Sequence, residues 1–258
     1  WSPLTEALFV VGTAPADSGN IVISETHYRP ASPTQPEIDA GHNRRGDFEF
    51  LELLNTGDHP VDLTSLDFSA GIDFTFAEHS SVAHLDPGAR LVIVADQDAF
   101  AMRYSGDIPV AGEFQNGTGL NNGGETLTLV NTTLPTGMQT VASVNYGDDA
   151  PWPTAPDGNG YSLTLACTGP ALDHNDPIFW RASVAIGGSP GTADGELLGD
   201  WLATNGLAAG QEATDLDFDG MAAIVEFAQG TDPNAAASFG YLSGGLQTFN
   251  VGGASETY

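Results

Sequence analysis

The sequence predicts a mainly β protein, an antiparallel β-sandwich followed by a small C-terminal α-helical module. Short apolar or alternating segments, separated by turn-forming sequences, fill residues 21–185. The pattern changes to helical spacing after residue 191. Hydrophobic residues make up 41% of the 258 residues, which is enough for a core, and the 32 glycines and 16 prolines suit many short strands joined by tight turns.

The first part of the chain is predicted to contain short strands. Residues 90–95 are nearly all apolar, which is typical of a central strand, whereas Leu127 and Leu129 alternate with threonines, which is typical of a half-buried strand. Turn-forming sequences, such as Asp-Pro-Gly at 86–88, separate most of these segments. The predicted strands are 21–27, 48–54, 61–63, 66–68, 72–76, 90–95, 126–130, 140–146 and 161–165. The side chains expected in the core are Leu91, Ile93, Leu127, Leu129, Leu163 and Leu165.

One helix is predicted within this β-rich part and two after it. Asp96 can cap a helix over residues 97–104, in which Phe100 and Tyr104 share one face. Apolar stripes then predict helices over 196–205 and 222–229. The predicted organisation is the last strand of a preceding domain or a linker (1–18, with a strand at 4–11), the β-sandwich with its extension (19–191), the helical module (192–236) and the start of a following β domain (237–258).

The charge balance restricts the partners of the chain. All six basic residues are arginines, and 34 acidic residues give a formal net charge of −28. Nucleic-acid affinity depends on phosphates that Lys and Arg neutralise, so we expect no binding to DNA or RNA. No apolar run approaches the roughly 20 residues that span a bilayer, so we expect no membrane insertion. The acidic surface suits either solubility in salty, calcium-rich water or the binding of cations.

An acidic loop near the C-terminus carries the most specific motif. Residues 215–226 match the pattern D-x-[DN]-x-[DN]-G-x5-E at every defined position. Calcium prefers about six to eight hard oxygen ligands, which such a loop supplies when it wraps around the ion, and Gly220 permits the sharp bend. Ala223, at the ninth position, has no side-chain oxygen, so we expect a water there. The predicted calcium ligands are Asp215, Asp217, Asp219, Met221 (through its backbone carbonyl) and Glu226.

Three glutamates offer a different hypothesis. Glu25, Glu49 and Glu52 lie on predicted strands and could meet across a sheet as the carboxylate pair of a glycoside hydrolase. Strands also carry acidic residues for structural reasons, and we favour that interpretation. The sequence contains no nucleophile elbow, phosphate-binding loop or dinucleotide fingerprint, so we expect no enzymatic activity.

Other single residues point to structure rather than to chemistry. Trp152 and Trp180 lie in loops, where burial at the ends of the sandwich is favoured over exposed stacking on sugar rings. Cys167, the single cysteine, is expected to pack as a small apolar residue. The six histidines show no metal-binding spacing. Asn116 and Asn131 begin acceptor sequences for N-glycosylation.

Several segments, taken in order, resemble bacterial lamin-tail domains. They are Ile-Val-Ile-Ser-Glu-Thr-His-Tyr (21–28), Phe-Glu-Phe-Leu-Glu-Leu-Leu-Asn-Thr-Gly (48–57), Val-Asp-Leu (61–63), Leu-Asp-Pro-Gly (85–88), Asn-Gly-Gly-Glu-Thr-Leu (122–127) and Val-Asn-Tyr-Gly-Asp (144–148). The resemblance covers residues 19–166 and implies an immunoglobulin-like sandwich, an accessory module of large secreted or surface proteins without catalytic residues. Residues 215–233 resemble the calcium repeats of bacterial surface proteins, akin to EF-hand, dockerin and thrombospondin type 3 loops.

These observations together predict a non-catalytic structural or adhesive segment of an extracellular or cell-surface multidomain protein, stabilised by calcium. Its expected partners, besides calcium, are neighbouring domains of the same polypeptide or other copies of it. The alternative is a carbohydrate-binding accessory module of a polysaccharide-acting secreted protein, with cell-surface polysaccharide as its partner. A row of exposed aromatic side chains on one sheet face would favour that alternative.

Overall fold

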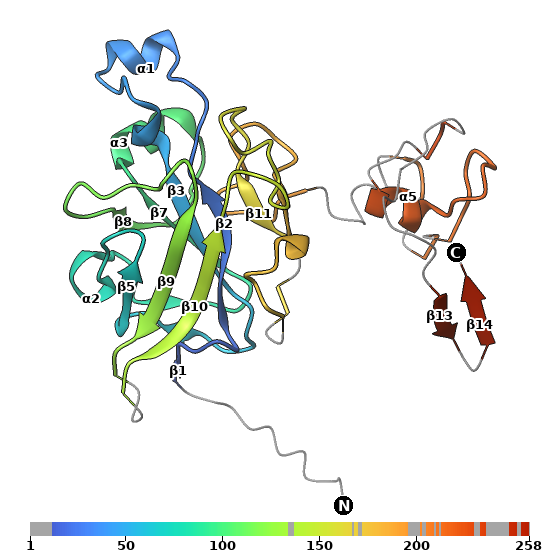
Figure 1. The fold of residues 1–258 in the computed structure, drawn as a ribbon, viewed down its shortest axis with the longest axis horizontal. Coiled ribbons are helices and arrows are strands. Elements are labelled where there is room, and N and C mark those ends of the chain that lie inside the picture. The colour runs from blue at the N-terminus through green and yellow to red at the C-terminus, as the bar shows by residue number, and fades with distance from the viewer. Residues whose placement is uncertain are drawn as a thin grey trace, which may run out of the picture. The chain divides into compact units, whose positions relative to one another are not determined.

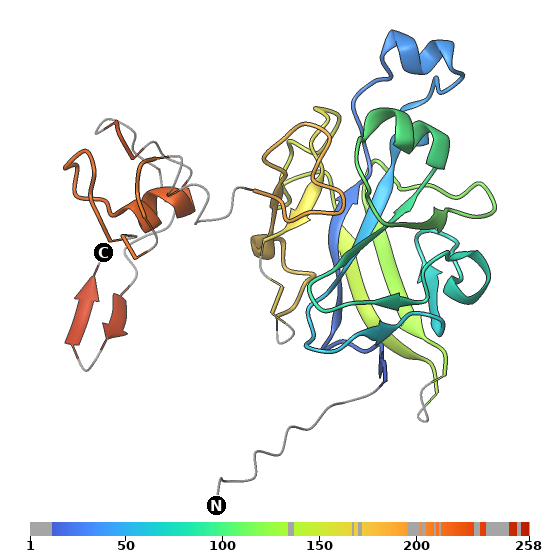
Figure 2. The same ribbon diagram turned by 180° about the vertical axis from the view of Figure 1, so that it is seen from behind.

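The chain divides into two compact units, Trp1–Gly195 and Glu196–Tyr258, and each is considered by itself (Figures 1 and 2). The structure is a computed structural model. It describes residues 12–133, 137–166, 168–169, 172–195, 202, 205–208, 210–211, 213–229, 233–235, 248–251 and 254–257. The strand predicted at 4–11, most of the helix predicted at 196–205, and Cys167 lie outside these described residues.

The larger sheet of the first unit has the strand order β12-β11-β2-β3-β7-β8. Its strands are β2 (Ile21–His27), β3 (Phe50–Asn55), β7 (Arg90–Val94), β8 (Val110–Glu113), β11 (Leu163–Leu165) and β12 (Trp180–Ala182). Neighbouring strands are antiparallel, except that β7 and β8 are parallel. Every residue of the central strands β2 and β3 is buried. Because successive side chains point to opposite faces, both faces of the sheet are covered there.

A second sheet packs against the larger one and closes the sandwich. It consists of β5 (Leu66–Ala70), β9 (Glu125–Asn131) and β10 (Gln139–Tyr146), all antiparallel, with β10 at one edge. Side chains of both sheets belong to one hydrophobic cluster, for example Leu53 of β3 and Leu129 of β9. The pair β9 and β10 lies in front of β2 and β3 in Figure 1 and behind them in Figure 2. Three short strands, β1 (Ala14–Pro15), β4 (Val61–Asp62) and β6 (His84–Leu85), form a third sheet.

The predicted mainly β fold class and the predicted core are confirmed. All six side chains expected in the core are buried, from 0% exposed for Leu91 to 8% for Leu165. The alternation in β9 buries Leu127 and Leu129 and leaves Thr126 exposed, as the sequence pattern indicates.

The strand predicted over residues 72–76 is wrong. Gly71, with φ +92°, turns the chain, and a single isolated bridge joins this segment to β5 before the short helix α2 (Phe76–His79) begins. The rings of Phe74 and Phe76 are buried, with centroids 5.0 Å apart. The alternating apolar residues therefore reflect burial of an irregular segment rather than strand pairing.

The helix predicted over 97–104 is confirmed as α3 (Gln97–Arg103). The Asp96 side chain accepts a hydrogen bond from the Ala99 backbone N–H at 2.9 Å, which is the predicted cap. The structure adds helix α1 (Gln35–Asp39) and the 3-10 turns η1 (Arg45–Phe48) and η2 (Pro177–Phe179), which the sequence did not predict. Because η1 includes Phe48, β3 begins two residues later than predicted.

The second unit has a small apolar cluster of its own. Its described elements are α5 (Ala223–Gln229) and a hairpin of β13 (Thr248–Val251) with β14 (Ala254–Thr257). The predicted helix 222–229 is thus present. Leu202, Leu207 and Ala223 are buried together, with Leu216 and Phe227 packed against them. In the described part of the chain, no helix combines the length and the apolar character that a membrane crossing requires.

Candidate functional site

The acidic loop brings three aspartates together as predicted. One carboxylate oxygen each of Asp215, Asp217 and Asp219 lies within 4.8 Å of the other two. Three oxygens of these side chains, Asp215 Oδ1, Asp217 Oδ2 and Asp219 Oδ2, are buried and accept no hydrogen bond from the described residues. Buried carboxylate oxygens ordinarily have a partner, so this arrangement favours a cation among them.

The other carboxylate oxygen of each aspartate accepts a hydrogen bond from a backbone N–H of the loop. Asp215 Oδ2 accepts a hydrogen bond from the Gly220 N–H at 3.0 Å, and Asp219 Oδ1 accepts one from the Met221 N–H at 2.7 Å. Asp217 Oδ1 accepts one from the Asp219 N–H at 3.2 Å. Each carboxylate thus uses one oxygen to shape the backbone and leaves another free of such a bond.

Two positive φ angles let the chain turn around the aspartates. Gly220 has φ +96°, which a glycine adopts without strain, as the motif requires. Phe218 has φ +62°, which is uncommon for a bulky residue, and its side chain is 89% exposed. The loop therefore carries backbone strain at Phe218 that no packing of its ring offsets.

Glu226, a further predicted ligand, is placed differently from the three aspartates. Glu226 lies in the first turn of α5 and is completely buried, but it is not part of the group of mutually close oxygens that the three aspartates form. Ala223 is completely buried in the apolar cluster with Leu202 and Leu207. This packing explains why the ninth loop position carries an apolar side chain rather than a ligand.

Of the three candidate glutamates, the structure brings together Glu25 and Glu52 but not Glu49. Glu25 and Glu52 are register partners on β2 and β3, and their exposed fractions are 1% and 0%. Glu49 precedes β3, accepts a hydrogen bond from the Leu120 N–H at 2.8 Å, and lines a separate pocket of about 520 Å³ with Asp96. Burial raises the pKa of Glu49 to about 7.

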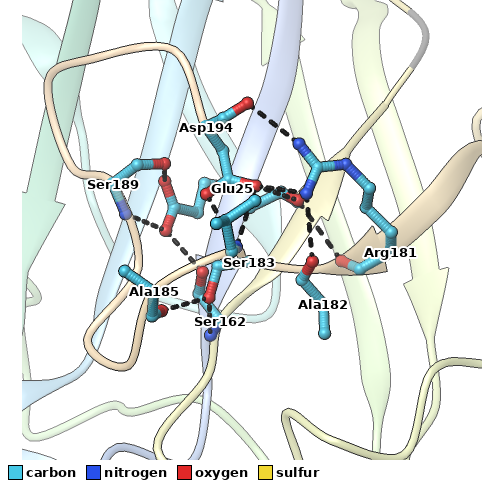
Figure 3. Close-up of polar contacts among 10 residues, drawn as sticks. Glu25, Ser162, Arg181, Ala182, Ser183, Ala185, Ser189 and Asp194 are labelled. Atoms are coloured by element: carbon cyan, nitrogen blue, oxygen red, sulfur yellow. Dashed lines mark hydrogen bonds and ion pairs between the residues drawn. The ribbon is translucent and has the colours of Figure 1, made fainter. Parts of the chain in front are cut away.

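Glu25 is surrounded by hydrogen-bond donors (Figure 3). Its Oε1 accepts from the Ser162 hydroxyl at 2.5 Å and from the Ser189 N–H at 2.9 Å, and its Oε2 accepts from the Ser189 hydroxyl at 3.0 Å. Burial, and next the charge of Glu52, raise the pKa of Glu25 to about 7, although the hydrogen bonds oppose that shift.

Glu52 has its own set of donors. Its Oε1 accepts from the Ser24 hydroxyl at 2.6 Å and from the Arg90 guanidinium at 2.5 Å, and its Oε2 accepts from the Gly191 N–H at 2.7 Å. Burial raises the pKa of Glu52, while Arg90 lowers it. Every carboxylate oxygen of the Glu25–Glu52 pair therefore accepts a hydrogen bond from within the protein. This supports a structural role for the pair rather than one in which it is presented to a sugar.

The aromatic side chains also have structural positions. Trp180 is buried and donates a hydrogen bond to the His174 carbonyl at 2.8 Å, and Trp152 is partly buried with its ring centroid 6.1 Å from that of Trp180. Among the residues whose side-chain exposure is described, Phe218 of the loop is the one exposed Phe, Trp or Tyr. The described sandwich therefore presents no row of exposed aromatic rings to a polysaccharide.

Comparison with known proteins identifies the β-rich part of the chain. The family model described as Lamin Tail Domain matches residues 14–148, slightly different bounds from the 19–166 expected from the resemblance. No curated protein and no solved structure matches the chain. The matched segment contains Glu25, Glu49 and Glu52, and it ends before the acidic loop begins.

Proposed function

The chain belongs to the lamin tail domain family, and on that premise we propose that it is a structural or adhesive segment of an extracellular or cell-surface multidomain protein whose acidic loop binds calcium. The family match over residues 14–148 and the mainly β fold indicate an immunoglobulin-like structural domain. The calcium ion, the extracellular location and the adhesive role are the parts that we add.

The three unpartnered oxygens of Asp215, Asp217 and Asp219 support the calcium proposal most directly. At about 4 Å, two like charges repel by about 1 kcal/mol even in water, so a cation among them is favourable. Calcium accepts carboxylate and carbonyl oxygens at about 2.3–2.6 Å in flexible geometry. The Met221 carbonyl and the carboxylate of Glu226, in the first turn of α5, would complete the ligands.

Calcium bound here would also order the second unit. Ala223 and Leu216 of the loop belong to the apolar cluster of that unit, so the same residues fold the loop and build the small core. Metal binding and folding then draw on the same free energy. The expected dissociation constant is about 10⁻⁴ to 10⁻³ M, the range of extracellular calcium modules.

A structural role suits the acidic residues of the sandwich. Glu25, Glu52 and Glu37 are buried and bonded to neighbouring strands, loops or arginines. The remaining acidic residues dominate a net charge of −28, which favours solubility where salt and calcium are abundant. Neighbouring domains of the same polypeptide, or other copies of it, are the partners that we propose for such a segment.

Calcium titration of the full chain tests this proposal. Isothermal titration calorimetry should detect one calcium site in the parent, and the double variant Asp215→Asn with Asp219→Asn should lose it. The double variant Asp148→Asn with Asp149→Asn removes the same charge from a loop of the sandwich and serves as the matched control. Limited proteolysis should cut residues 213–229 faster in chelator than in calcium, for the parent and the control only.

Two outcomes would contradict the proposal. Calcium binding of equal affinity in the parent and in the Asp215/Asp219 variant would show that the ion binds elsewhere. Equal proteolysis of the loop in calcium and in chelator would show that the ion, if bound, does not order it. Substituting these two aspartates leaves Glu226, which is buried, in place and so avoids disturbing the packing of α5.

A further inference from the structure

The segment that follows β12 folds back over the buried Glu25–Glu52 pair. We call residues 187–191 the latch segment. Ser189 donates two hydrogen bonds to Glu25, and the Gly191 N–H donates one to Glu52 (Figure 3 shows the contacts of Ser189). At Gly188, which has φ +80°, an added Cβ would lie 2.1 Å from Glu25 Oε1. The latch segment thus approaches the two carboxylates so closely that only glycine fits at Gly188.

Neutral contacts complete the attachment. The Gly187 N–H donates to the Gly160 carbonyl at 2.7 Å, and the Tyr104 hydroxyl donates to the Gly187 carbonyl at 2.8 Å. These bonds do not involve carboxylates. The part of the free energy of closure that varies with protonation of the carboxylates therefore comes from the bonds of Ser189 and Gly191 to Glu25 and Glu52.

The charges around Glu25 leave it without a cationic partner. Arg90 on β7 pairs with Glu52 at 2.5 Å, and Arg181 on β12 pairs with Asp194 at 2.6 Å. Tyr104, at the end of α3, is neutral, because burial raises its pKa. Among the described residues, the one neighbouring charge that acts appreciably on Glu25 is the like charge of Glu52.

The hydrogen bonds of Glu25 survive its protonation. A serine hydroxyl can donate or accept, so a proton on Oε2 can be donated to the Ser189 hydroxyl, which at present donates to Oε2. Oε1 can continue to accept from Ser162 and from the Ser189 N–H. The neutral form therefore keeps every bond to the latch segment and removes the repulsion from Glu52.

We propose that the latch segment is a pH-dependent closure of the sandwich, which protonation of Glu25 tightens and ionisation of Glu25 loosens. Opening would expose Glu25 to water, where its charge is solvated. The latch segment and the carboxylates it covers share no residue with the proposed calcium loop, residues 215–226.

The direction follows from the two states of Glu25. Its pKa is about 7 in the closed structure and would approach the ordinary value of 4.5 when the segment opens. Closure is therefore most favoured below the lower value, weakens as the pH rises toward the higher one, and becomes constant above it. Each unit of difference between the pKa values of the open and closed states changes the equilibrium constant for opening tenfold. The full difference, from 4.5 to about 7, therefore changes that constant roughly 300-fold between low and high pH.

Hydrogen exchange of the full chain, corrected for the intrinsic effect of pH on exchange, tests the latch. Peptides that contain Ser189 and Gly191 should lose at least about tenfold in protection between pH of about 5 and about 8. The variant Glu25→Gln, a neutral substitute for the protonated acid, should keep high protection at both pH values. Glu49→Gln is the matched control, because Glu49 is also buried with its pKa raised to about 7 but bonds to Leu120 instead.

The comparison between the variants decides the proposal. Protection that is independent of pH in the parent would overturn it, as would a pH dependence that remains unchanged in Glu25→Gln. If Glu25→Gln does not fold, Ser189→Ala provides the second measurement, since it removes the hydroxyl partner from the latch side alone. It should lower protection of the latch segment at acid pH while peptides of β9 stay unchanged, and equal protection in parent and variant would overturn the proposal.

Discussion

Glu25 and Glu52 are opposite each other on the two central strands of the larger sheet, and the protein itself donates to each of their carboxylate oxygens. Two buried acids at adjacent positions repel, and only Glu52 has an arginine partner. The pair therefore connects the two central strands of the sheet to the latch segment that covers it. Its members should respond to substitution in different ways.

Glu52→Ala should lower the free energy of unfolding by about 3–5 kcal/mol, because it leaves the guanidinium of Arg90 without its carboxylate. The Arg90 side chain is only 17% exposed, so water cannot replace the partner fully. Urea denaturation followed by near-ultraviolet circular dichroism measures the change. The control Asp58→Ala removes a carboxylate that is 92% exposed, and it should change stability by less than about 0.5 kcal/mol. A loss in Glu52→Ala no larger than in this control would contradict the prediction.

Glu49→Gln should stabilise the protein at alkaline pH and have little effect at acid pH. Because the pKa of Glu49 is about 7 in the folded protein against 4.5 normally, its contribution to stability is present below 4.5 and is lost as the pH rises through 7. The amide avoids that loss, which amounts to at most about 3 kcal/mol. Urea midpoints from acid to alkaline pH measure the difference between variant and parent.

Glu37→Gln should have the opposite effect on stability in the same urea experiment. Hydrogen bonds from Arg103 lower the pKa of Glu37 to about 2, so its contribution is present above 4.5 and is lost as the pH falls through 2. This variant should therefore destabilise the protein at neutral pH. If both variants shifted stability in the same direction at neutral pH, the assignment of the two carboxyl groups would be wrong.

Phe218→Asn should strengthen calcium binding about fivefold. Asparagine tolerates the left-handed conformation that Phe218 adopts, whereas bulky residues are strained there by about 1 kcal/mol. The ring is 89% exposed, so its loss removes little packing. Phe218→Val should weaken binding instead, since a β-branched residue suits this conformation least. Calorimetric titration with calcium measures both, and equal affinities in the two variants would contradict the account.

The chain should not bind nucleic acid at about 0.15 M salt. Its net charge is −28, and four of its six arginines are paired, with Asp157, Glu52, Glu37 and Asp194. These pairs leave little positive charge for phosphates. Fluorescence anisotropy of a labelled DNA duplex should stay constant up to micromolar protein. An increase in anisotropy that added salt abolishes would show a basic surface that the charge balance does not predict.

The sequence predicted the features that depend on local pattern. The alternation in β9, the apolar run of β7 and the aspartate spacing of the loop all correspond to what the structure contains. It did not predict β8, where Gly112 interrupts the pattern. That glycine is required by tertiary contact, because an added Cβ would lie 2.5 Å from the His79 carbonyl.

The contacts of the buried glutamates were beyond the reach of local pattern. The sequence indicated that Glu25, Glu49 and Glu52, all on predicted strands, could meet as a carboxylate pair, but not which two of them would do so. Ser189 and Gly191, however, come from a glycine-rich segment that follows the last strand of the sandwich, with no periodicity to link them to β2 or β3. Only the folded chain shows that this segment covers the acids.

The edge strand β10 has a consequence for how copies of this chain can associate. None of its residues is charged or proline, so in isolation it would readily add a strand from another molecule. Two features oppose such addition. The register of β10 with β9 shifts between Thr140 and Ala142, and the Asn175 side chain accepts the Asn145 N–H at 2.9 Å. Fibre-like growth by strand addition is therefore obstructed at this edge of the three-stranded sheet.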